Sequence, residues 1–163
     1  MSEATIDGFT RDLLLAVIPA VVVGVVTAIL SVKLALRRFR QERWWERKSQ
    51  AYTDLFAALF HVQRYNRVLL SRIEEGTQVS SDYLDRVAEL ATEGYSEIRK
   101  SVALGTFVFS AETAGRLEAL QIELDDPRYD EDAYEETTAL LSAVTSAIAD
   151  LKPLAKRDLA LKK

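Results

Sequence analysis

The sequence contains no cysteine and a single histidine, His61. Without thiols it can build neither a disulfide framework nor thiolate chemistry. His61 has no Asp or Glu at a spacing that would complete a metal site, so we expect it at the surface or at the edge of a bundle. Glycine-rich phosphate loops and Ser/His/Asp sets are also missing. These absences predict a chain that is not an enzyme and that binds neither a cofactor nor a metal ion.

Proline and glycine are scarce, with three and six residues among 163. The alternation of β-branched and polar residues that is typical of strands does not extend beyond a few positions. Apolar residues instead recur at helical spacing over the part of the chain that follows residue 36. The sequence therefore predicts an all-α fold.

Charge is absent from residues 13–32, LLLAVIPAVVVGVVTAILSV. Twenty helical residues span about 30 Å, the thickness of the hydrocarbon core of a bilayer. A cleaved signal peptide is disfavoured, because the preceding residues are acidic, the run is long and no convincing small-residue cleavage site follows. The predicted organisation is a short extracytoplasmic N-terminus (1–12), a transmembrane helix (13–36), a basic juxtamembrane stalk (37–48) and a cytoplasmic helical bundle (49–163).

Cations follow the uncharged run directly. Residues 1–48 carry eight cations and five acids, whereas residues 49–163 carry thirteen cations and twenty acids. Because cytoplasmic flanks carry the excess of lysine and arginine, we expect the C-terminal part in the cytoplasm and the N-terminus outside. The same cations would lie against anionic headgroups, or would do no more than set the topology. The predicted headgroup and topology residues are Lys33, Arg37, Arg38, Arg40, Arg43, Trp44, Arg47 and Lys48.

The charge balance also bears on partners. The acidic character of residues 49–163 disfavours nucleic acid as a ligand, since phosphate neutralisation needs clustered cations. We expect the lipid bilayer as one partner, further copies of the chain as a second and a soluble cytoplasmic protein as a third.

Small residues recur at four-residue intervals inside the uncharged run. Such a spacing lets two membrane helices approach closely, so it predicts self-association of the chain. The alternative is that alanine and glycine are simply common in membrane spans. The predicted contact face consists of Ala16, Ala20, Gly24 and Ala28.

Apolar spacing predicts four helices after the uncharged run. The first continues from residue 37 to 75 with a heptad-like spacing, and the others cover 81–103, 111–124 and about 130–151, where Pro153 interrupts. Short connections favour antiparallel neighbours. The expected fold is one N-terminal transmembrane helix that continues into the long helix of a cytoplasmic antiparallel four-helix bundle. Its predicted core is Trp45, Tyr52, Leu55, Leu59, Val62, Leu69, Leu117, Leu120, Leu141, Val144 and Ile148.

Several single residues have specific predicted roles. Gly94, with Ala91, marks a place where a neighbouring helix can approach closely, and Ser110 is expected to cap the helix 111–124. Asn66 lies at an apolar position, where it would fix register or oligomeric state or would be partly exposed at the end of the bundle. The acidic run 125–136 fails the calcium-loop pattern and is predicted to be a solvated loop.

The two adjacent tryptophans follow the end of the uncharged run closely enough to lie near the membrane interface, where aromatic residues gather. We expect Trp44 to face lipid or nearby cations and Trp45 to enter the bundle core.

Three short segments resemble a group of small bacterial membrane proteins. They are Trp45-x-x-Lys48-x-x-Ala51-Tyr52-x-x-Leu55, Gly105-x-Phe107-x-Phe109-Ser110-x-Glu112 and Arg157-Asp158-Leu159. The resemblance covers most of residues 44–160. It implies a bacterial protein with a single membrane span and an all-helical cytoplasmic domain, and it implies no active site.

Two function classes follow from these features. The first is a membrane-anchored, self-associating helical scaffold or interaction protein at the bacterial inner membrane. The alternative is an oligomeric sensor-effector of the defence or toxin type, whose cytoplasmic bundle controls the spans and the integrity of the membrane. Only Thr27 and Ser31 are polar within the predicted span, which disfavours a stable aqueous channel.

Overall fold

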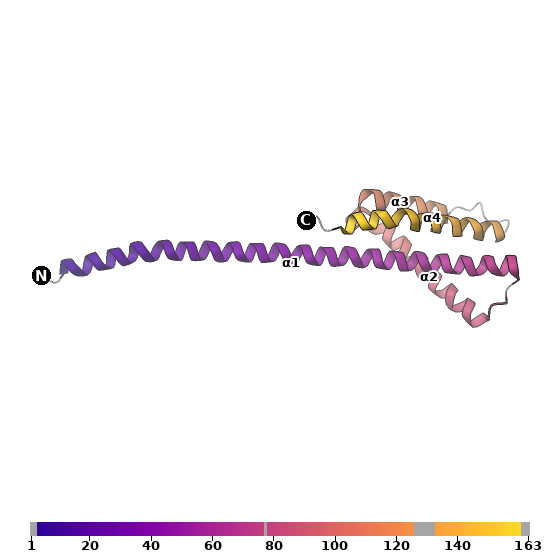
Figure 1. The fold of residues 1–163 in the computed structure, drawn as a ribbon, viewed down its shortest axis with the longest axis horizontal. Coiled ribbons are helices and arrows are strands. Elements are labelled where there is room, and N and C mark those ends of the chain that lie inside the picture. The colour runs from indigo at the N-terminus through magenta and orange to yellow at the C-terminus, as the bar shows by residue number, and fades with distance from the viewer. Residues whose placement is uncertain (1–2, 77, 126–132, 161–163) are drawn as a thin grey trace. The chain divides into compact units, whose positions relative to one another are not determined.

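The computed structural model describes residues 3–76, 78–125 and 133–160, and the side chains of these ranges from Thr27 onward. Within them lie the helices α1 (Glu3–Glu75), α2 (Ser81–Leu104), α3 (Ala111–Leu124) and α4 (Ala133–Leu159), with the short 3-10 helix η1 (Gly105–Phe107) between α2 and α3 (Figure 1). No strand occurs in these ranges, and the predicted all-α class is confirmed.

The ends of the first three helices follow local sequence signals. α1 ends at Glu75, and Gly76 has a φ of 59°, a conformation that glycine adopts at little cost. The hydroxyl of Ser110 accepts a hydrogen bond from the Thr113 N–H at 3.3 Å, which confirms Ser110 as the cap of α3. The bounds of α2 and α3 agree with the predicted 81–103 and 111–124 within one residue.

α4 departs from its predicted end. The helix continues through Pro153 to Leu159, so the prediction that Pro153 interrupts it is wrong. Pro153 itself is exposed, whereas Leu151 and Ala155 on either side of it are buried in the core. Proline in a helix removes one backbone hydrogen bond. The packing of the apolar side chains on both sides of Pro153 outweighs that loss.

The chain divides into two compact units, residues 1–44 and residues 45–163. We call the second the helical unit; it begins at Trp45, whereas the predicted bundle begins at residue 49. Most predicted core residues are buried in it: Tyr52, Leu55, Leu59, Val62, Leu117, Leu120, Val144 and Ile148. Leu69 and Leu141 are half-buried, and Trp45 lies at the edge with 40 % of its surface exposed, not in the core as expected. The core also contains Phe109 and Ile98.

Within the helical unit, α4 lies antiparallel to the C-terminal part of α1. Polar contacts pair early residues of that part with late residues of α4: Trp45 with Leu159, Tyr52 with Asp158, Gln63 with Thr145 and Glu74 with Tyr134. A helical bundle is consistent with this packing. The up-and-down order of all four helices stays a prediction.

α2 crosses the same part of α1 obliquely (Figure 1). A Cβ atom placed on Gly94 would lie 2.8 Å from the carbonyl oxygen of Ala58 and 3.1 Å from a methyl carbon of Val62. Only glycine fits at such a separation without a shift of one backbone. The predicted close approach at Gly94 is confirmed.

Candidate functional site

A polar cluster ties α1, α3 and α4 together in the helical unit. Its members are Lys48 and Tyr52 from α1, Ser110 and Thr113 at the start of α3, and Asp158 near the end of α4. The Oδ2 atom of Asp158 accepts hydrogen bonds from the Tyr52 hydroxyl at 2.5 Å and from the Ser110 backbone N–H at 3.1 Å. The Lys48 ammonium lies 3.7 Å from the same oxygen. We call these five residues the Asp158 cluster.

Hydroxyl groups complete the hydrogen bonding of the cluster. The Tyr52 and Thr113 hydroxyls lie 3.0 Å apart, and the Ser110 hydroxyl donates to Thr113 Oγ1 at 3.0 Å. The Asp158 carboxylate sits at the N-terminus of α3, where unpaired N–H groups and the helix dipole favour a negative charge. Asp158 therefore supplements Ser110 as a cap of α3 from another helix.

Burial and charge set the protonation states of the cluster. Burial alone would raise the pKa of Asp158, but the hydrogen bonds from Tyr52 and Ser110 and the nearby Lys48 ammonium lower it below its ordinary value. Burial and the hydrogen bond to the Asp158 carboxylate raise the pKa of the Tyr52 hydroxyl. At neutral pH Asp158 is ionised and Tyr52 is a neutral hydrogen-bond donor. Every polar group of the cluster is engaged with another, so these contacts connect the three helices.

Apolar and ionic contacts surround the cluster. The Tyr52 and Phe109 rings meet edge to face with their centroids 5.0 Å apart. The Trp45 indole N–H donates to the Leu159 carbonyl oxygen at 3.1 Å, which explains why Trp45 stays at the edge of the unit. Arg157 and Glu112 form an ion pair beside the cluster. These contacts hold the last turn of α4 against the first turn of α3 and the beginning of the helical unit.

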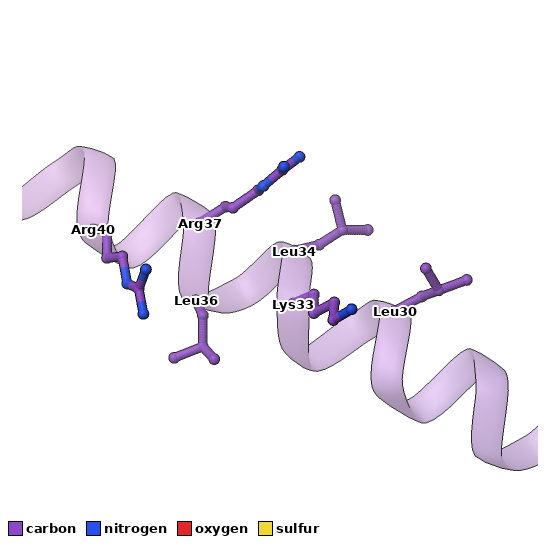
Figure 2. Close-up of a pocket in the computed structure, with 6 residues that line it drawn as sticks. All are labelled: Leu30, Lys33, Leu34, Leu36, Arg37 and Arg40. Atoms are coloured by element: carbon purple, nitrogen blue, oxygen red, sulfur yellow. The ribbon is translucent and has the colours of Figure 1, made fainter.

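The unit formed by residues 1–44 presents a different surface. Its large apolar side chains between Ile29 and Phe39 are each 49–64 % exposed. Figure 2 shows six side chains that project from successive turns of α1 and border a shallow depression: Leu30, Lys33, Leu34, Leu36, Arg37 and Arg40. We call Lys33, Arg37 and Arg40, with the leucines beside them, the basic face.

The predicted headgroup residues do not share one environment. Arg38 forms an ion pair with Glu42 at 3.0 Å, and the guanidinium of Arg43 lies 4.6 Å from the centroid of the Phe39 ring. Trp44 is 52 % exposed, and Arg47 is exposed. Lys48, by contrast, belongs to the Asp158 cluster, and only 19 % of its side chain is exposed.

Most of the predicted membrane contact face falls outside the described side chains: Ala16, Ala20 and Gly24 lie there, and only Ala28 is described, as exposed. In the part of the chain that the structure describes, no helix combines the length and the apolar character that crossing a bilayer requires.

The two isolated polar residues of α1, Asn66 and His61, differ in their burial. Asn66 is 1 % exposed; its Nδ2 donates to the Val62 carbonyl oxygen at 2.9 Å, and its side chain also bonds Tyr95. It is a core residue of its own chain and not a partly exposed one. His61 is half-buried beside a shallow depression that Glu93 and Glu97 also border. No group of three metal-ligating side chains gathers in the described ranges, and residues 126–132 of the acidic run lie outside them.

The Asp158 cluster is the feature that sequence patterns alone did not predict. The only sequence feature that indicates this cluster is the set of three segments that carry the resemblance to small bacterial membrane proteins. Each of these segments contains part of the cluster or of its surroundings. Lys48 and Tyr52 come from the first segment, Phe109 and Ser110 from the second and Asp158 from the third. The structure brings together three stretches that are far apart in the chain. No family model, curated protein or solved structure matches the sequence.

Proposed function

We propose that the chain is a membrane-anchored, self-associating helical scaffold at the inner membrane of a bacterium. Residues 13–36 would anchor it, and the helical unit would bind a soluble protein partner in the cytoplasm. The observation that carries the proposal is the row of exposed large apolar side chains between Ile29 and Phe39, which begins inside the uncharged run. Burial of apolar surface contributes a favourable free energy of about 25 cal/mol for each Å² removed from water. The hydrocarbon core of a bilayer can bury such apolar side chains along a single helix.

The polar chemistry of the helical unit supports an interaction role over catalysis. The Asp158 cluster is engaged in its own hydrogen bonds, and its carboxylate and phenol have the pKa shifts of a stable donor–acceptor pair. A general acid or base instead needs a pKa near the working pH and access to substrate.

Membrane extraction tests the anchor. The full chain expressed in a bacterium should stay in the membrane pellet after alkaline carbonate washing and dissolve only in detergent. Val22→Lys combined with Val26→Lys places two charges in the predicted span, each worth about 2.5–3.5 kcal/mol against insertion, and should release the chain. Glu118→Lys, an exposed change in α3, is the control and should remain in the pellet. A wild-type chain that the carbonate wash dissolves would refute the anchor.

Disulfide crosslinking tests self-association, and the absence of native cysteine makes single-cysteine variants unambiguous. Ala20→Cys and Gly24→Cys lie on the small-residue face, whereas Val22→Cys lies on the opposite side of the same helix. Oxidation in native membranes should crosslink the first two into dimers and leave the third monomeric. Equal crosslinking at all three positions would mean random collision, and no crosslinking at any of them would remove self-association from the proposal.

A further inference from the structure

The cations of the basic face form one line along α1. Lys33, Arg37 and Arg40 follow at intervals of four and three residues, which places them on the same side of a helix. Leu30 and Leu34 project on one side of this line and Leu36 on the other (Figure 2). The face therefore presents positive charge and apolar surface together.

The charges on this face are not neutralised by any side chain that the structure describes. Among the described residues, no carboxylate pairs with Lys33, Arg37 or Arg40. Arg38, in contrast, is paired with Glu42, and Arg43, one turn beyond Arg40, lies over the Phe39 ring. Two cations of this segment are thus already engaged, whereas the three on the basic face are available to an anion.

The spacing along the helix matches the depth of a lipid headgroup layer. Lys33 directly follows the uncharged run, and Arg37 lies about 7.5 Å beyond Val32 at 1.5 Å per residue. The polar layer of a bilayer is about 5–8 Å deep on each side of the hydrocarbon core. Arg40, about 12 Å beyond Val32, can reach back with its long side chain, as arginine does at membrane interfaces. Leu30 would meet acyl chains and the cations would meet phosphate.

We propose that the basic face is a binding site for one anionic phospholipid, whose phosphate is held by Lys33, Arg37 and Arg40 and whose acyl chain covers Leu30 and Leu34. The proposal rests on the membrane anchor proposed above. Guanidinium groups suit this ligand because their paired N–H donors match two phosphate oxygens. Leucine on either side of the cations adds the apolar contact that a soluble phosphate does not require.

A comparison of two double variants tests the site. The full chain is purified in detergent micelles, and phosphatidylglycerol or phosphatidylcholine is added at equal mole fraction. Native mass spectrometry then counts the lipids retained by each protein. The wild type should retain phosphatidylglycerol in preference to phosphatidylcholine. Since one cation near a lipid surface changes affinity roughly fivefold, Arg37→Gln with Arg40→Gln should weaken phosphatidylglycerol retention roughly 25-fold.

The matched control removes the same number of charges from two neighbouring arginines that already have partners within the helix. Arg38→Gln with Arg43→Gln should weaken retention less than fivefold, because Glu42 and Phe39 already engage these two arginines. Equal losses in both double variants would overturn the site in favour of a diffuse basic belt. Displacement of the lipid by millimolar inorganic phosphate, or equal binding of a short DNA duplex, would also overturn it.

The outcome is separable from that of the anchor. Arg37→Gln with Arg40→Gln leaves residues 13–32 intact, so this variant should stay in the membrane pellet after carbonate washing. A variant that remains in the pellet and retains phosphatidylglycerol as the wild type does would refute the lipid site alone. A wild type that leaves the pellet would refute the anchor.

Discussion

At the scale of single residues, Asp158 has the most specific role. One of its carboxylate oxygens accepts hydrogen bonds from Tyr52 of α1 and from the Ser110 N–H that precedes α3, and it also lies near the Lys48 ammonium. Only 8 % of its side chain is exposed, so these contacts are shielded from water. Hydrogen bonds to a charged group contribute about 1.5–3 kcal/mol each when they are formed in such surroundings. A change at Asp158 should therefore affect three helices and not one.

Asp158→Asn tests the charge at constant shape. We expect it to lower the free energy of unfolding of the helical unit by about 2 kcal/mol, since the amide is a weaker acceptor and leaves Lys48 unpaired. The pH dependence should change as well. The lowered pKa of folded Asp158 means that the unfolded chain binds this proton more readily, so the stabilisation is present above about pH 4 and lost as the pH falls through the folded pKa.

Thermal unfolding of the full chain in detergent, followed by circular dichroism between pH 3 and pH 7, measures both effects. The wild type should lose stability towards pH 3 more steeply than Asp158→Asn does. Parallel curves for the two proteins would show that the charge of Asp158 adds nothing.

Tyr52→Phe tests whether the cluster acts as one network. The variant keeps the ring contact with Phe109 and removes the hydroxyl. Each single change should cost about 1–2 kcal/mol, and the double variant with Asp158→Asn should cost less than the sum of the two by about 0.5–3 kcal/mol, as expected for residues in direct contact. Simple additivity in the same thermal measurements would contradict a shared network.

At the scale of secondary-structure elements, the crossing of α1 and α2 at Gly94 sets how closely two helices pack. The backbone oxygen of Ala58 cannot move aside as a flexible side chain would. Gly94→Ala should therefore destabilise the helical unit by about 1–3 kcal/mol, the usual cost of overpacking.

Gly115→Ala is the matched control for Gly94→Ala. Gly115 is also helical, and a Cβ atom there would meet nothing within 4 Å. This second change should stabilise the chain by up to about 1 kcal/mol, because alanine is the better helix former. Opposite signs for the two variants support the close crossing, and a stabilising Gly94→Ala would contradict it.

Pro153 gives a second test of helix energetics. Proline in a helix interior costs about 3 kcal/mol, of which about 1 kcal/mol is recovered because proline restricts the unfolded chain. Pro153→Ala should therefore raise the free energy of unfolding by about 2 kcal/mol without changing the helical content measured by circular dichroism. A gain in helical content would mean that α4 ends near Pro153 in solution.

The elements also show what the sequence could predict. Gly76 and Ser110 are local signals, and the helix ends beside them agree with prediction. Pro153 is equally local, but long-range packing overrides it. The Asp158 cluster joins residues up to 110 positions apart, and no spacing rule along one helix connects Lys48 with Asp158. Trp45 differs from its predicted core position for the same reason, since its hydrogen-bond partner is Leu159.

At the scale of the whole molecule, the charge asymmetry predicts the orientation of the chain in the proposed anchor. A green fluorescent protein fused after Lys163 should fluoresce, because it folds on the cytoplasmic side of the inner membrane. Neutralising Lys33, Arg37, Arg38, Arg40 and Arg43 while placing lysine at Glu3 and Asp7 leaves three cations before the predicted span and two between residues 33 and 48. This change moves the positive excess to the other flank, and should invert the chain and abolish the fluorescence. Undiminished fluorescence with equal protein levels would show that these charges do not set the topology.

The hydrogen bond between Trp45 and Leu159 has a consequence for synthesis of the chain. Donor and acceptor are 114 residues apart, and a ribosome adds about 5–20 residues per second. The indole therefore exists roughly 6–23 s before its acceptor is made. Leu55, Leu59 and Val62 share one core with residues of α4, and this core stays incomplete until α4 has been made. Removal of residues 156–163, which deletes both Asp158 and Leu159, should therefore lower the yield of folded protein far more than the loss of eight residues suggests.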